Sequence, residues 1–298
     1  MSLLFNKFVP IILIFFFGVM LKGVRIFSRK DGGLFLRLVF YFTLPALILS
    51  SVIDAELNVE YITLPFIPIL VIFLIYLVSY QVVKRFKVNL PTRGTYLIGS
   101  LIINTGFCLP FIVSVFGSEG ITIYTIYDFG NTFLIMTFVY YLAIKHGSNH
   151  DGKVEISKFL KLPPLWALIT GIILNLGNVG MPTTIDSFLS LAGSPTVPLV
   201  MLSLGIFFSP SLKNLSRTFT VIMIRSGLGL ILGILIVEIL GFSGMLRTIV
   251  IICCGAPVGY NTLVFCSLEN LNSELAANLI SYSILTGLIY VPLLLIYL

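Results

Sequence analysis

Apolar residues fill most of this chain in ten long runs that are separated by short polar stretches. Each run is about 20 residues long, which is the length that an α-helix needs to cross the hydrocarbon core of a bilayer. The runs cover residues 5–24, 33–53, 61–83, 94–116, 119–143, 162–181, 184–208, 216–239, 245–266 and 275–297. We therefore predict an all-α membrane protein with ten transmembrane helices.

The longest polar stretch divides the chain into two halves of similar length. It spans residues 145–161, and we interpret it as a cytoplasmic linker between a first five-helix repeat, 1–144, and a second one, 162–298. Five spans per half is an odd number, so the second repeat must enter the membrane inverted relative to the first. The loops are too short for a folded domain outside the bilayer.

Composition excludes several classes of protein. Of the 298 residues, 58% are hydrophobic and only 10% are charged, whereas a soluble domain carries about 25% charged residues. A soluble enzyme, a secreted disulfide scaffold and a nucleic-acid binder are therefore excluded, and the lipid bilayer is the expected environment. The four cysteines all lie in apolar runs, which favours buried thiols over disulfides or metal ligands.

The basic residues explain the net charge of +6 and indicate the orientation. Fourteen Lys and Arg residues lie in the loops that follow runs 1, 3, 5 and 7, whereas Lys7 and Arg247 alone lie in the loops or tails of the other side. Because cytoplasmic loops are enriched in Lys and Arg, both termini are predicted outside the cytoplasm of a multi-pass cell-membrane protein. The positive charge indicates topology rather than a nucleic-acid partner.

Prolines and small residues recur at related places in the two halves. Pro45 in the second run is matched 153 residues later by Pro198 in the seventh, and Pro110 in the fourth run is matched 147 residues later by Pro257 in the ninth. Paired interruptions of this kind in inverted repeats are typical of secondary transporters, with the binding site at the breaks.

The fourth and ninth runs hold the predicted substrate site. The fourth carries Asn104, Thr105 and a break at Pro110, and the ninth carries Pro257 and Asn261 near its middle. If both helices unwind there, two half-helix N-termini with partial positive charge converge and can bind a carboxylate. The alternative is an ordinary pair of proline kinks in which Asn and Thr join neighbouring helices.

Asp128 and Arg225 are two further candidates, and each is a charged residue inside an apolar run. Asp128 is about 14 Å deep at 1.5 Å per residue, where it is a candidate proton or cation site or else a helix-to-helix hydrogen-bonding group. Arg225 in the eighth run is expected to extend its side chain to the interface rather than to bind an anion. His146 and His150 share one polar loop and are expected to be solvated.

Motifs for enzymatic chemistry are absent from the sequence. It has no phosphate-binding loop, no HExxH and no arrangement of Ser, His and Asp, so we expect no enzyme, no cofactor and no bound metal.

The residues at these positions resemble the auxin efflux carrier (PIN-like) family, within the bile-acid/sodium symporter superfamily, over essentially the whole chain. The resemblance rests on the following motifs: Asn104-Thr-Gly-Phe with Leu109-Pro110, Phe116-Gly117, Asp128 with Gly130-Asn131, Asn178-Val-Gly-Met-Pro182, Pro198 to Gly205, Ala256-Pro257-Val-Gly259-Tyr-Asn261 and Ser273-Glu-Leu-Ala276. It implies ten helices in two inverted repeats, with broken helices 4 and 9 that cross at their prolines.

The resemblance also implies small organic anions as substrates, such as malate, malonate or auxin-like acids. The family binds the carboxylate with asparagines, to which Asn104 and Asn178 correspond here. We therefore expect a secondary carrier that works by alternating access, with a proton or sodium as a candidate coupling ion and a second copy of the chain as a candidate partner. Two alternatives stay open: an ion exchanger without an organic substrate, and a membrane sensor that binds ligand without transport.

Overall fold

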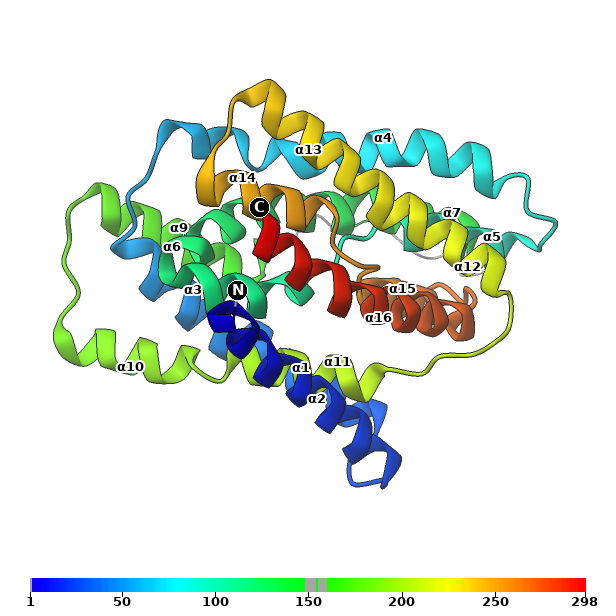
Figure 1. Cartoon of the computed structure of the whole chain (residues 1–298), viewed down its shortest axis with the longest axis horizontal. Helices are drawn as coiled ribbons and strands as arrows, with labels where there is room; N and C mark the ends of the chain where they lie inside the picture. Colours follow the sequence, from blue (N-terminus) through cyan, green and yellow to red (C-terminus); the bar gives the residue numbers. More distant parts are fainter. Residues whose placement is uncertain (1, 148–153, 155–159) are drawn as a thin grey trace. The chain divides into compact units, whose positions relative to one another are not determined.

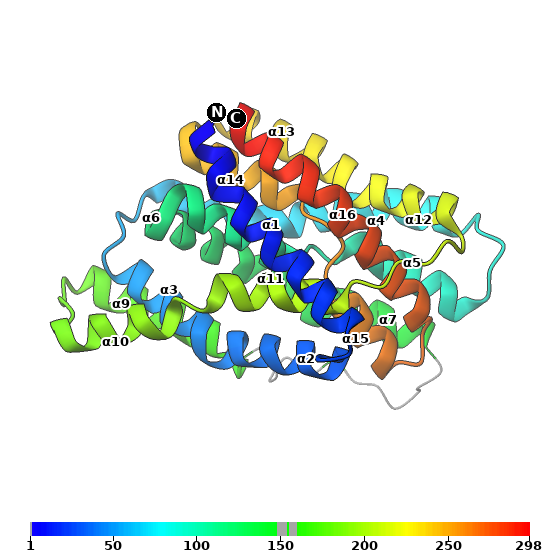
Figure 2. The same ribbon diagram turned by 60° about the horizontal axis from the view of Figure 1, so that its bottom comes forward.

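Helices make up nearly all of the structure, a computed structural model that describes residues 2–147, 154 and 160–298, with side chains from residue 6. Within these ranges the strand-like pairing is a single isolated antiparallel bridge between Ile103 and Val258. The prediction of an all-helical protein is thus confirmed for the described residues. Figures 1 and 2 show the chain from two directions.

The helices of the first 147 residues follow one another with short connections. They are α1 (Ser2–Gly23), α2 (Arg29–Leu38), η1 (Val39–Thr43), α3 (Leu44–Ile53), η2 (Val59–Thr63), α4 (Phe66–Val83), α5 (Leu90–Leu101), α6 (Thr105–Leu134), η3 (Ile135–Val139) and α7 (Tyr140–His146).

The remaining helices are shorter on average. They are α9 (Pro163–Leu176), α10 (Thr183–Gly193), α11 (Thr196–Phe207), α12 (Leu215–Ile222), η4 (Met223–Leu228), α13 (Gly229–Leu240), α14 (Gly244–Cys254), α15 (Asn261–Leu268) and α16 (Ser273–Tyr297). Most of the predicted linker, 145–161, lies outside the described residues.

Among the residues that the structure describes, seven helical stretches are long and apolar enough to cross a membrane by length and composition. They are Asn6–Gly23, Arg29–Ile53, Val59–Val83, Thr105–His146, Thr183–Phe207, Leu215–Leu240 and Ser273–Tyr297. Pro163–Leu176 and Gly244–Cys254 are shorter apolar helices. The structure is therefore that of a multi-pass membrane protein.

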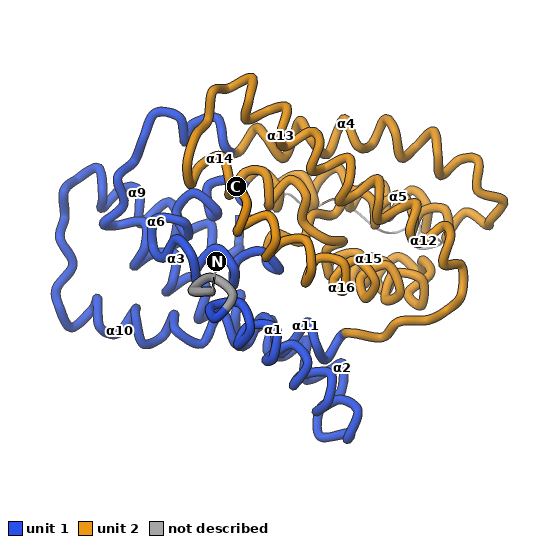
Figure 3. The backbone as a smooth tube through the Cα atoms, viewed as in Figure 1, with its two compact units in different colours: residues 1–64, 106–129, 160–207 blue, residues 65–105, 130–159, 208–298 orange. Residues whose placement is uncertain are grey.

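The chain divides into two compact units, which Figure 3 shows in different colours. Unit 1 contains residues 1–64, 106–129 and 160–207, and unit 2 contains 65–105, 130–159 and 208–298. Each unit draws segments from both of the predicted repeats. The two predicted repeats, 1–144 and 162–298, follow the order of the sequence, whereas the two units are groups of segments that pack together in space. The division into repeats therefore stays a prediction.

In unit 1, pairs of helices approach each other closely at positions where one helix carries a glycine. A Cβ added at Gly18 of α1 would lie 3.2 Å from the Cα of Gly205 in α11, so neither position has room for a side chain. Helix α9 packs on α3 in the same way, with Gly171 against Val52. In Figure 2, α1 crosses α11, and the two helices pack on each other. Close backbone approach at small residues is how helices associate in membranes.

In unit 2, the two shortened helices α5 and α14 form the centre. Helix α5 is buried from Gly94 to Leu101 and α14 from Thr248 to Cys254. Both pack against the long helix α16. The residues that follow each helix, 102–104 and 255–259, are buried as well, so the two breaks lie deep inside the unit.

Candidate functional site

Both helices that the sequence predicted to be broken are interrupted, and the breaks meet. Helix α5 ends at Leu101 and α6 begins at Thr105, while α14 ends at Cys254 and α15 begins at Asn261. Residues 102–104 fill the first break and residues 257–259 lie within the second, and the two segments pair through the bridge between Ile103 and Val258. We call these two segments the crossover. All of its residues belong to unit 2.

Main-chain hydrogen bonds hold the crossover together in a symmetric pattern. The amide of Asn104 donates to the carbonyl of Pro257 at 2.9 Å, and the amide of Gly259 donates to the carbonyl of Ile102 at 2.9 Å. The amide of Val258 donates to the hydroxyl of Ser283 in α16 at 3.1 Å. Unwound backbone is tolerated at membrane depth when protein groups satisfy its polar atoms, and these bonds provide that satisfaction.

The position of one break differs from the sequence prediction. Pro257 lies in the unwound segment as predicted, but Pro110 lies inside α6, and the first break comes several residues earlier at 102–104. A proline inside a helix removes one backbone donor and tends to kink the helix, yet α6 continues through Pro110. In a continuous helix, the carbonyl of residue 102 and the amide of residue 104 would bond within the helix. Here they bond to residues 259 and 257 instead, so the pairing between the two segments decides where the chain unwinds.

The predicted substrate residues of these two runs surround the crossover. Asn104 is 8% exposed, and its Nδ2 donates to the carbonyl of Val258 at 3.4 Å. Thr105 is the first residue of α6 and accepts a 3.4 Å bond from the amide of Asn131. Asn261 is the first residue of α15 and is partly buried. The chain thus places an asparagine or threonine at the start of each half-helix.

The helix ends of unit 2 give the crossover a mixed electrostatic character. The first amides of α15 carry partial positive charge, because the helix dipole adds about half a charge at each end. The last carbonyls of α5 and α14 carry the complementary negative charge. Such a site can bind an anion on one side and hold a positive group on the other without a fixed ion pair.

Asp128 and Asn178, the other two candidates, lie in unit 1. Asp128 is partly buried within α6. Asn178 is exposed just beyond α9 and adopts a left-handed conformation with φ of 51°. The amide of Val179 donates to the carbonyl of Leu174 at 3.0 Å, the bond that closes a helix end of this type. Asn178 therefore has a local role in ending α9.

Arg225 differs from the sequence expectation. Its side chain is 0% exposed, so it does not extend to the membrane interface. Nη2 instead donates to the carbonyl of Cys254, the last residue of α14. The spacing Arg225, Gly229, Gly233 was a usable signal, because residues four apart share one helix face and a face of small residues admits a second backbone.

Two further polar residues at the end of α15 and α7 were not predicted to be buried. Glu269 follows α15 directly, is 1% exposed and accepts a 2.7 Å bond from the hydroxyl of Tyr140. His146, expected to be solvated, is buried at the end of α7, where its Nδ1 lies 2.9 Å from the carbonyl of Leu142. Its side chain fills the space that Gly94 leaves on α5. His150 lies outside the described residues.

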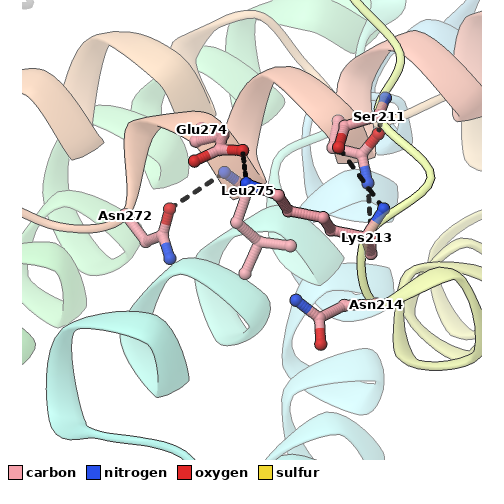
Figure 4. Close-up of a pocket in the computed structure, with 7 residues that line it drawn as sticks. Ser211, Lys213, Asn214, Asn272, Glu274 and Leu275 are labelled. Carbon is pink, nitrogen blue, oxygen red and sulfur yellow. Dashed lines mark hydrogen bonds and ion pairs between the residues drawn. The ribbon is translucent and has the colours of Figure 1, made fainter.

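A small pocket of about 60 Å³ opens near the start of α16 (Figure 4). Lys213 pairs there with Glu274 at 3.0 Å, and Asn272 caps α16 by accepting a 3.0 Å bond from the amide of Leu275. Asn278 also lines the pocket, and its Oδ1 accepts a 2.7 Å bond from the amide of Ser211. A pocket of this size holds about two waters, so we regard it as part of the loop structure.

The described residues show no group of three His, Cys, Asp or Glu side chains that could hold a metal ion. Cys108, Cys253, Cys254 and Cys266 are all buried, which confirms that the cysteines lie in the interior.

Comparison with known proteins extends the likeness over the whole chain. A family model described as "Membrane transport protein" matches residues 3–295. An uncharacterized transporter of Methanothermobacter thermautotrophicus is 26% identical over 284 residues, which are 93% of this chain and 92% of the relative. An uncharacterized transporter of Methanocaldococcus jannaschii is 25% identical over 286 residues, with the same shares. The chain therefore belongs to the membrane transport protein family that contains the auxin efflux carriers.

Proposed function

We propose that this transporter is a secondary carrier of small organic carboxylates, and that the carboxylate binds at the crossover. The observation that carries this proposal is the meeting of two interrupted helices in unit 2, with α6 and α15 both beginning there. The sequence contains no ATP-binding motif, so transport draws on a concentration gradient, an ion gradient or the membrane potential.

The chemistry of the crossover suits a carboxylate better than a neutral solute. Helix N-termini offer amide donors and partial positive charge, the combination that binds anions throughout proteins. Asn104, Thr105 and Asn261 add side-chain donors at the starts of α6 and α15, and Pro257 keeps the second segment unwound. We assign these residues to the substrate site, with Asn178 as an additional candidate and Pro110 as a residue that shapes the start of α6.

Three contacts in unit 1 support the inverted repeat on which alternating access depends. The hydroxyl of Thr196 donates a 2.8 Å hydrogen bond to the hydroxyl of Thr43, which lies 153 residues earlier in the chain. The same offset of 153 relates Gly18 to Gly171 and Val52 to Gly205. The contact of Gly18 with Gly205 is therefore equivalent to the contact of Gly171 with Val52. In an inverted repeat, a residue that contacts the equivalent residue of the other repeat lies close to the two-fold axis that relates the repeats. Other contacts then occur in equivalent pairs on the two sides of that axis.

The helix bounds support ten spans. The stretch Thr105–His146 contains 42 residues and would be about 63 Å long as a straight helix, twice the thickness of a hydrocarbon core. It is interrupted at Gly117, where φ is 59° and ψ is −141°. If the part before Gly117 joins α5 across the crossover, and α9 and the α14–α15 pair each cross once, the total is ten.

Asp128 is the proposed coupling site for a proton or a sodium ion. It lies partly buried in α6, within an apolar span, where an ionisable group is costly and commonly functional. Replacement by Asn would keep the shape of the side chain and remove its charge. If Asp128 couples transport to an ion, the variant retains carboxylate binding but loses its dependence on pH or sodium.

Transport should be measured with purified protein in liposomes. Charge movement is recorded as malate, malonate, other short carboxylates and indole-3-acetate are added in turn, first to wild type and then to Asn104→Ala and Asn261→Ala. We expect a current with one class of acid and a fall in apparent affinity of about tenfold or more in each variant, the loss of one charge-assisted hydrogen bond.

The control is Asn58→Ala, which changes an exposed asparagine in the loop before η2 of unit 1. It should transport like wild type. A response to sodium or pH jumps without any response to acids would favour the ion exchanger. Binding of an acid without flux would favour the sensor, and unchanged affinity in both asparagine variants would move the site away from the crossover.

A further inference from the structure

Arg225 occupies an unusual place for a charged residue. It lies in η4, a short π-helical stretch between α12 and α13, within the apolar span Leu215–Leu240. Its side chain is fully buried, and its guanidinium donates to the carbonyl of Cys254 at the end of α14. π-helical turns inside α-helices are frequent at functional sites, and this one directs a positive charge at a helix break.

The neighbouring helix face is shaped to bring α14 within reach of this arginine. Gly229 and Gly233 follow Arg225 at intervals of four residues, so the three share one face of the helix. A Cβ added at Gly229 would collide with the carbonyl oxygen of Cys254, and one added at Gly233 would lie 2.7 Å from the Cβ of Cys254. The last turn of α14 therefore rests on glycine backbone next to the guanidinium.

Three successive carbonyls at this break receive side-chain donors. Beyond the bond from Arg225 to Cys254, the hydroxyl of Tyr290 donates to the carbonyl of Gly255 at 2.6 Å. The hydroxyl of Ser226 donates to the carbonyl of Ala256 at 3.4 Å and lies 3.2 Å from the Tyr290 hydroxyl. We call Arg225, Ser226 and Tyr290 the carbonyl clamp. All of its atoms belong to unit 2.

Carbonyls at the C-terminal end of a broken membrane helix form the kind of site that binds sodium in transporters, because they combine oxygen ligands with the negative end of a helix dipole. In this chain a guanidinium and two hydroxyls meet those oxygens. We propose that Arg225 is a resident cation that takes the place of a bound metal ion at the α14 break. The carrier then needs no sodium at this position, a consequence that rests on the proposed function.

Arginine suits this task better than lysine. Its guanidinium stays protonated at any physiological pH and offers several donors in one plane, whereas an ammonium is a compact point charge that loses its proton more easily when buried. A resident guanidinium therefore gives a charge at the break that does not depend on ion concentration or on pH.

The test compares thermal unfolding of purified wild type, Arg225→Ala and Arg225→Lys in detergent. Each protein is heated in choline chloride, sodium chloride or guanidinium chloride at roughly 50 mM, a concentration at which a millimolar ligand stabilises the folded state by mass action. In choline, we expect Arg225→Ala to unfold about 6–12 °C below wild type. Guanidinium or sodium should recover a large part of that loss, and Arg225→Lys should fall between the two proteins.

The matched control is Arg37→Ala, which removes an exposed arginine from α2, also within an apolar run. Its unfolding midpoint should respond to the three salts as wild type does. Equal midpoints for Arg225→Ala and wild type, or a deficit that neither guanidinium nor sodium reduces, would overturn the proposal. If Arg225→Ala cannot be purified, the same salt comparison on Arg225→Lys decides, because a shorter cation leaves space that guanidinium or sodium would fill.

A transport arm separates this inference from the proposed function. In liposomes, guanidinium should stimulate Arg225→Ala and leave wild type unaffected, while equal stimulation of both would count against a resident cation. Salt-specific recovery of stability in a protein that transports no carboxylate would keep the inference and reject the proposed function. Carboxylate transport without any such recovery would do the reverse.

Discussion

At the scale of single residues, two asparagines at the end of α9 have different roles in unit 1. Asn175 is partly buried, and its Nδ2 lies within hydrogen-bonding distance of the carbonyls of Val52, Ile53 and Ala55, at 3.2, 2.7 and 2.8 Å. These carbonyls lie at and just beyond the end of α3, where the last carbonyls of a helix lack the partners that a continuing helix would supply, although that of Val52 also accepts a 3.3 Å bond from the amide of Ala55. Asn178, the residue that the family resemblance selected, is exposed and ends α9 through its backbone.

We predict that Asn175→Leu is destabilising and that Asn178→Gly is not. The first change leaves partly buried carbonyls at the end of α3 without their donor, which should cost about 2 kcal/mol of unfolding free energy. The second keeps a residue that accepts positive φ without strain. Thermal unfolding in detergent measures both, and equal losses in the two variants would contradict this assignment.

Asn178→Gly also tests the candidate substrate role of this residue. Because the variant preserves the backbone conformation and removes only the amide, a lower carboxylate affinity in liposomes would point to substrate contact. Unchanged affinity would leave Asn178 with its role at the end of α9 alone.

At the scale of helices, glycine and proline predicted interruptions correctly but did not locate all of them. Pro257 lies in an unwound segment, whereas Pro110 continues α6. Gly117 interrupts the same helix with φ of 59° and ψ of −141°, a conformation essentially restricted to glycine. The sequence showed Gly117 at the end of the fourth apolar run, but the required backbone angles become evident only in the folded chain.

Gly117→Ala should therefore be destabilising for conformational reasons alone. A Cβ at this position meets nothing within 4 Å, so no steric clash contributes. The strained backbone should cost about 1–3 kcal/mol, and thermal or denaturant unfolding would measure it.

The matched control is Gly33→Ala in α2, where an added Cβ also meets nothing within 4 Å and φ is ordinary. Alanine is the better helix former, so this variant should be neutral or more stable by about 0.5–1 kcal/mol. If both variants behaved alike, the interruption at Gly117 would not depend on its backbone angles.

At the scale of the whole molecule, the distribution of basic residues predicts one orientation in the membrane. Asn58 lies in the exposed loop after the second apolar run, and Lys87 lies in the exposed loop after the third. The excess of Lys and Arg places the second of these loops in the cytoplasm and the first outside. The four native cysteines are buried, so they contribute little background to thiol labelling.

Single-cysteine variants test this orientation directly. A membrane-impermeant thiol reagent should label Asn58→Cys in intact cells and should label Lys87→Cys only after the cells are permeabilised. The reverse pattern would invert the topology and place both termini in the cytoplasm. Labelling of both sites in intact cells would indicate a mixed orientation.

The sequence by itself determined the class of protein, the all-helical structure and the location of the apolar runs. These properties depend on local quantities, namely the length of each run and the cost of exposing polar backbone to lipid. It also indicated that the runs around Asn104 and Pro257 are interrupted. Each of these features is encoded within about 20 consecutive residues.

Only the tertiary structure decided how distant segments meet. Residues 102–104 unwind because residues 257–259 provide their hydrogen bonds, and Arg225 stays buried because its guanidinium donates to the carbonyl of Cys254, which lies next to Gly229. His146 is buried because Gly94 on another helix leaves it space. In each case the partner is many residues away, so the free energy that selects the conformation arises from contacts that no local pattern contains.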